Sequence, residues 1–276
     1  MIRQLSIAAL ALAFFSGSLL WGDDIVPDRS TQYGHIDQNT PGITNGGNAC
    51  GPTSAYNSFV YLAGQNPGLN GLLGTDAVSA INEIGKDMSL PQGNTGGVFD
   101  NNFISGKIQY IHDHGLDNKV SVEYQAVNPG TGRPSTAHPS EAFLYEQLAK
   151  GQDVEVGFGW NGTGGGGHWV TATGLDFNTT SDTGTLDFVD PWGGVDIQGN
   201  LSLDANGNLV LSYSGGAAGN PADTSDNPGD ASSGTIDIIV AESPVPLPSV
   251  AWAGFGCLVG FAGFQKVRQG RQLKAA

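Results

Sequence analysis

The apolar pattern of this chain changes once, at about Gly151, from helical spacing before that glycine to strand-like patterns after it. Apolar residues recur every three or four positions in segments 50–64, 98–115 and 138–151. The later segments alternate or run apolar between turn residues: 153–160, 168–177, 184–194, a hairpin over 199–214 around Asn206-Gly207, and 234–242. Helices first and antiparallel strands last predict an α+β domain.

The first 22 residues have the layout of a secretory signal peptide. Arg3 precedes an apolar run from Leu5 to Leu20, and no acidic residue occurs before Asp23. We therefore expect an exported protein and leave residues 1–22 out of the fold prediction.

Residues 243–276 predict a membrane anchor. An apolar stretch with a candidate transmembrane helix at about 247–264 precedes four basic residues, which suits a cytoplasmic flank. The order of a short proline motif, an apolar span and a basic tail resembles the PEP-CTERM sorting signal of bacteria, with "VPLP" in place of Pro-Glu-Pro. The resemblance implies sorting by an exosortase-type protease. The alternative is an ordinary C-terminal anchor, and in both cases the domain works outside the cytoplasm, membrane-anchored or at the cell surface.

The segment between the two ends is strongly acidic. All 26 acidic residues lie there with only six of the 11 basic ones, which gives a net charge of −20. Such a surface repels nucleic acid and anionic lipid, so we exclude both as partners of the domain. We predict one domain over 23–242, with Ser212–Thr235, which is poor in apolar residues, as a flexible loop or linker.

Cys50 in "NACGPTSAYN" is a candidate nucleophile. Exported chains usually pair or avoid thiols, whereas this cysteine lies between a glycine-rich loop and the start of a predicted helix. The positive end of the helix dipole favours a thiolate there. The alternative is a buried, inert cysteine.

His168 and Asp190 are the candidate partners of that thiol. His168 follows the glycine run "GTGGGG" and opens a strand, and histidine is the usual proton acceptor for a nucleophile. The other histidines lie in predicted loops or on a polar helix end. Asp190 ends the next strand before Pro191, within reach of an imidazole on the neighbouring strand, although an aspartate in a turn before proline is also common.

The three motifs together resemble the papain-like cysteine peptidases of the bacteriocin-processing, double-glycine type. The resemblance covers about residues 36–194. It implies a papain-like fold in which the N-terminal helix carrying the nucleophile packs on an antiparallel sheet, with Cys50 as nucleophile, His168 as general acid and base, and Asp190 as the orienting group. It also implies an oxyanion donor upstream of the cysteine, for which Gln38 is the candidate and Asn45 and Asn48 are alternatives.

The sequence therefore predicts an exported, surface-sorted cysteine peptidase that acts on a peptide or protein substrate through a thioester. An amidase or a transpeptidase would use the same residues. The competing hypothesis is a non-catalytic surface or matrix module with the same fold.

We expect no cofactor and no metal. Asp204, Asn206 and Asn208 alternate as calcium ligands do, but the distal glutamate of an EF-hand is missing, so a plain Asn-Gly turn is favoured. The histidine and cysteine spacing does not suit zinc.

Overall fold

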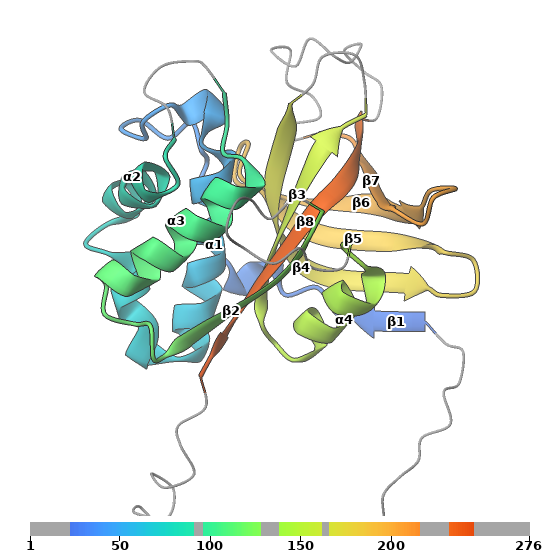
Figure 1. The fold of residues 1–276 in the computed structure, drawn as a ribbon, viewed down its shortest axis with the longest axis horizontal. Helices are drawn as coiled ribbons and strands as arrows, with labels where there is room; N and C mark the ends of the chain where they lie inside the picture. Colours follow the sequence, from blue (N-terminus) through green and yellow to red (C-terminus); the bar gives the residue numbers. More distant parts are fainter. Residues whose placement is uncertain (1–22, 91–95, 128–137, 162–165, 216–231, 246–276) are drawn as a thin grey trace, which may run out of the picture.

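The computed structural model describes residues 23–90, 96–127, 138–161, 166–215 and 232–245. Its α-helices are α1 (Cys50–Gln65), α2 (Ala77–Asp87), α3 (Asp100–Asp113) and α4 (Glu141–Ala149), with short 3-10 helices at Ser30–Gln32, Gly46–Asn48 and Pro67–Leu73. Its strands are β1 (Asp23–Val26), β2 (Val120–Ala126), β3 (Asp153–Trp160), β4 (Gly167–Asn178), β5 (Thr183–Asp190), β6 (Val195–Leu203), β7 (Leu209–Tyr213) and β8 (Ser232–Pro244). Figure 1 shows α1, α2 and α3 gathered on one side of the strands.

Six of the strands close into an antiparallel barrel. The order β4-β3-β8-β7-β6-β5 returns to its start because β4 also pairs with β5, while β1 adds to β4 and β2 adds to β8. The predicted fold class, a papain-like helix on an antiparallel sheet, was therefore wrong. Local alternation identifies strands but not the long-range β3–β8 pairing, from Asp153↔Glu242 to Trp160↔Gly234, that closes the barrel.

The inside of the barrel is filled by the alternate residues of its strands. Val154, Val156 and Phe158 of β3 face Val170 and Ala172 of β4 in one buried cluster. This cluster also includes side chains from β5 to β8, and α4, which packs on β1, β3 and β4, adds two leucines to it. The period-two pattern read from the sequence sets which face of each strand points inward.

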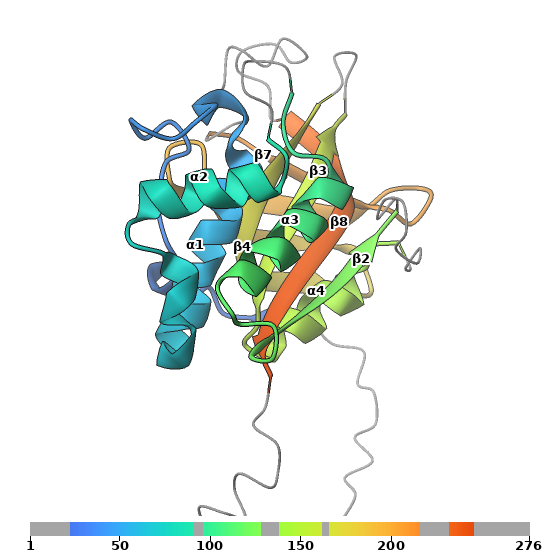
Figure 2. The same cartoon turned by 60° about the vertical axis from the view of Figure 1, so that its left-hand side comes forward.

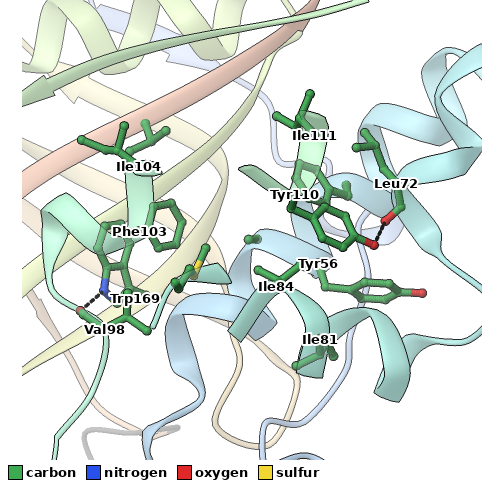
Figure 3. Close-up of a cluster of buried hydrophobic side chains, with 14 of the residues drawn as sticks. Tyr56, Leu72, Ile81, Ile84, Val98, Phe103, Ile104, Tyr110, Ile111 and Trp169 are labelled. Atoms are coloured by element: carbon green, nitrogen blue, oxygen red, sulfur yellow. Dashed lines mark hydrogen bonds between the residues drawn. The ribbon is translucent and has the colours of Figure 1, made fainter. Parts of the chain in front are cut away.

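A second buried cluster joins the helices to the outside of the barrel. Phe103 of α3 stacks on Trp169 of β4 with ring centroids 3.7 Å apart, and Trp169 Nε1 donates to the Val98 carbonyl (Figure 3). Ser54 of α1 donates its hydroxyl to the Trp169 carbonyl, and Thr171 donates to the Ser54 carbonyl. These bonds fix α1 against β4, as the turned view in Figure 2 also shows.

The predicted helical segments and strands are confirmed within one or two residues at most ends, whereas α2, β1 and β2 were not predicted. The ends of the predicted 212–235 loop belong to β7 and β8, and its centre, 216–231, lies outside the described residues. The predicted signal peptide and transmembrane helix also lie outside them. Among the described residues, no helix combines the length and apolar character needed to cross a bilayer.

Candidate active site

Cys50 is the first residue of α1, directly after the 3-10 turn at Gly46–Asn48. Its side chain is 7% exposed, and the helix continues because Thr53 N–H bonds the Ala49 carbonyl. No side chain of the described residues caps this helix end, so its first N–H groups remain available to a negative group. The sulfur thus lies at the positive end of the α1 dipole.

His168 and Asp190 meet at the ends of two paired strands. His168 is the second residue of β4, Asp190 is the last of β5, and their Nε2 and Oδ1 atoms are 2.8 Å apart. Asp190 is fully buried and also accepts a hydrogen bond from the Trp192 backbone N–H at 2.8 Å. Oδ1 of Asp190 is therefore bonded both by the Trp192 N–H and by the imidazole, and the carboxylate fixes the orientation of the imidazole.

The Cys50 side chain is the other group that acts on the imidazole, close enough to raise its pKa. Burial alone would lower the pKa of His168, but the Asp190 charge and hydrogen bond, together with Cys50, raise the pKa to about 10. Two aromatic rings border the imidazole: Trp160 is stacked at 6.1 Å and Phe158 is edge-on at 5.9 Å. The ring is thus charged at neutral pH, in a site closed mainly by apolar surface.

This raised pKa predicts how stability depends on pH. The pKa of His168 is about 10 in the folded chain, higher than its unfolded value of 6.5. Protonated His168 therefore stabilises the fold fully below pH 6.5, and this stabilisation is lost as the pH rises toward 10. We expect the difference in unfolding free energy between the wild type and His168→Gln to shrink steadily from pH 6 to pH 10. Urea unfolding of the full-length proteins at several pH values measures it, and a pH-independent difference would contradict the assignment.

Gln38 is bonded to the turns next to Cys50 and Asp190 although it precedes Cys50 by twelve positions. Its backbone N–H bonds the Pro191 carbonyl at 2.8 Å, and its Nε2 donates to the Gly46 carbonyl at 2.8 Å. The side chain is 1% exposed, and its Oε1 has no hydrogen-bond partner within the described part of the chain. Gln38 therefore bridges the turn after Asp190 to the turn before the cysteine.

The loop around Gln38 is held in place by its neighbours on both sides. Asp37 Oδ1 accepts from the Gly193 N–H at 3.1 Å, and a side chain at Gly194, whose φ is 61°, would collide with the His35 carbonyl. Asn45 and Asn48 lie in the turn before α1 and are less buried than Gln38. Of the three predicted candidates, Gln38 is the one whose backbone bonds the turn after Asp190.

Sequence reasoning did not identify the groups that support the site, namely the Trp160 and Phe158 rings, the Trp192 N–H and the Gly193-Gly194 turn. A signal was present, because "FGW" ends the strand before the glycine run that leads to His168, and "PWGG" follows Asp190 directly. Aromatic and glycine residues next to two candidate catalytic positions indicate a packed turn.

The Cys50, His168 and Asp190 side chains form one row, in which His168 bonds Asp190 at 2.8 Å and lies close enough to Cys50 for the thiol to raise the imidazole pKa. No protein-family model matches this chain, and no curated protein matches it. The row contains a nucleophile, a group that can carry its proton, and a buried carboxylate that orients that group, and this combination performs acyl transfer.

Proposed function

We propose that this chain is an exported, surface-sorted cysteine peptidase that hydrolyses peptide bonds through Cys50, His168 and Asp190. The observation that carries the proposal is the row of these three side chains at the uncapped start of α1, with His168 bonded to Asp190 and its pKa raised by Asp190 and Cys50. The motifs around them resemble bacteriocin-processing peptidases, and the two terminal segments support export and sorting at the cell surface.

The reaction begins with the Cys50 thiolate paired with the His168 imidazolium. The sulfur attacks the carbonyl carbon of the scissile peptide bond, and the carbonyl oxygen becomes an oxyanion. His168 then donates its proton to the amine nitrogen, the C–N bond breaks, and a thioester remains on Cys50. A water molecule, deprotonated by His168, attacks the thioester, and the carboxylic acid leaves.

The developing oxyanion needs donors that are fixed before the reaction. We assign this role to the Cys50 backbone N–H and to the second N–H of Gln38 Nε2, because the first is bonded to the Gly46 carbonyl. The near-complete burial of Gln38 keeps water from competing for that donor. Asp190 takes no proton and holds His168 in position.

An electrophilic peptide probe tests the proposed function. We expect full-length protein treated with iodoacetamide or with a peptide bearing a carbon electrophile to be modified at Cys50, much faster than a free thiol at neutral pH. Peptide mapping by mass spectrometry locates the adduct. Cleavage of a peptide panel, with and without an added amine acceptor, separates hydrolysis from transpeptidation.

The second cysteine of the chain provides a matched control. Cys257→Ser should react like the wild type, whereas Cys50→Ala should lose the fast adduct and stay folded, since a small buried side chain is shortened. Reaction at Cys50 no faster than at a free thiol would reject the peptidase and favour a non-catalytic surface module.

A further inference from the structure

A second group of charged side chains lies between the helices and the barrel, outside the candidate active site. Asp153 and Glu155 of β3, Glu242 of β8 and Lys107 of α3 are all completely buried. One carboxylate oxygen from each of the three acids lies within 4.8 Å of the others. The proposed peptidase reaction uses none of these residues.

The contacts inside this buried acidic cluster leave part of it unsatisfied. Lys107 Nζ bonds Glu155 Oε1 and Glu242 Oε2 at 2.5 Å each, and Ser58 of α1 donates to Asp153 Oδ2 at 2.8 Å. The second oxygen of each acid, Asp153 Oδ1, Glu155 Oε2 and Glu242 Oε1, has no hydrogen-bond partner among the described residues. Three buried acceptors in one place require a positive partner.

The charges of the cluster do not balance. With all three acids ionised, three carboxylates and one ammonium leave two negative charges in a region without solvent, and burial raises the pKa of Asp153 and of Glu242 in the absence of a further cation. Asp153 and Glu242 also lie directly opposite each other on paired strands, an arrangement that is unfavourable for like charges. Because buried charges are normally paired or bound to a metal, Lys107 alone is not sufficient.

The Tyr33 hydroxyl is another buried polar group whose pKa is affected by the acids of the cluster. The residue is 5% exposed, its ring is stacked on Tyr61 at 4.4 Å, and its hydroxyl has no hydrogen-bond partner within the described ranges. Burial and then the charges of Asp153 and Glu155 raise the Tyr33 pKa well above its ordinary value, so this oxygen lies in the field of the same acids. The Tyr33 hydroxyl is thus a further buried polar group that lacks a hydrogen-bond partner among the described residues.

We propose that Asp153, Glu155 and Glu242 bind one divalent cation, and that calcium fits the site best. Two positive charges neutralise the cluster when Lys107 is counted, and a set made only of oxygen ligands suits a hard cation. The ligand oxygens lie within 4.8 Å of one another, and calcium suits a completely buried site better than magnesium, which gives up its water ligands reluctantly. The ion would tie β3 to β8 beneath α3.

Calcium binding to the full-length protein tests this proposal without any measurement of peptidase activity. After removal of metals with a chelator during unfolding and refolding, we expect refolding with radioactive calcium to leave one ion per chain after gel filtration. A saturating calcium concentration, about 100 times Kd, should raise Tm by about 5 to 10 °C, and equal magnesium should raise it less. No retained calcium together with an unchanged Tm would overturn the proposal and leave protons as the neutralising species.

Variants place the ion on the chain. Glu155→Gln should lose the retained calcium, whereas Asp204→Asn should keep it, because the Asp204 carboxylate is already bonded within its turn by Asn206 and Asn208. The reverse pattern would overturn the assignment.

Terbium luminescence in the wild type answers the same question if Glu155→Gln fails to fold. A decay that barely changes between H2O and D2O places the ion in the sealed cluster. A decay that lengthens strongly in D2O places the ion on the wet acidic surface and overturns the proposal.

Discussion

Replacing His168 with alanine should slow the alkylation of Cys50 at neutral pH by about 10²- to 10⁴-fold, the usual contribution of a positioned proton acceptor. The imidazolium, whose pKa is raised to about 10, is the group that can hold the thiol proton and stabilise the sulfur anion. The measurement is the second-order rate of iodoacetamide adduct formation at Cys50, followed by peptide mapping, with peptide cleavage assayed in parallel.

The control for this prediction is His112→Ala. That histidine is exposed and bonds only Asp117 among the described residues, so its removal should leave the Cys50 rate unchanged. His168→Ala also leaves the buried Asp190 without its partner, and thermal unfolding must therefore show that the variant is folded at the assay temperature. Equal alkylation rates in folded His168→Ala and wild type would show that the imidazole does not activate the sulfur.

Much of the secondary structure follows from local patterns. Cys50 opens α1 because Pro52 occupies the first turn, where its missing N–H is not needed, and the buried Ala55, Phe59 and Leu62 recur on one face. Alternation in β3 and β4 separates the barrel interior from the face that packs on the helices. These rules depend only on residues that are close together in the chain, so they can be applied to a single sequence.

The closure of the barrel does not follow from such patterns. β4 is twelve residues long and pairs with β3 over its first part and with β5 over its second part, with a shift in register between Ala172 and Gly174. A side chain at Gly184 would overlap the Asp176 backbone, so glycine permits the close approach of β5 to β4. These strands are neighbours in the chain, whereas the pairing that closes the barrel joins β3 to β8, with Asp153 opposite Glu242, and local patterns do not show it.

The candidate site was predicted more completely than the fold. Nucleophilic chemistry requires a thiol, an imidazole and a carboxylate, so the residue types and order of Cys50, His168 and Asp190 could be recognised in the sequence. The structure places the three side chains together. Gln38 was harder to place because its position depends on a bond to Pro191, which is 153 positions away. Contacts between distant loops leave little trace in local composition.

The buried acidic cluster was even harder to predict from local composition than the position of Gln38. Its members come from α3, β3 and β8, and each one looks like an ordinary surface charge in its own segment. Only the packing of α3 over the barrel brings Lys107 to Glu155 and Glu242, where it also lies 5.0 Å from the centre of the Phe59 ring. The ammonium is therefore a central structural group of the helix–barrel interface.

Lys107→Met should lower the free energy of unfolding by about 3 to 5 kcal/mol in chelator, because it leaves the buried carboxylates without their cation while keeping most of the apolar packing. Lys150→Met removes an exposed pair with Glu146 and should leave the stability unchanged within error. Urea unfolding measures both. Adding Glu155→Gln and Glu242→Gln to Lys107→Met should recover part of the loss, because the uncompensated charges are then gone. A loss that persists in this triple variant would assign the role of Lys107 to its packing rather than to its charge.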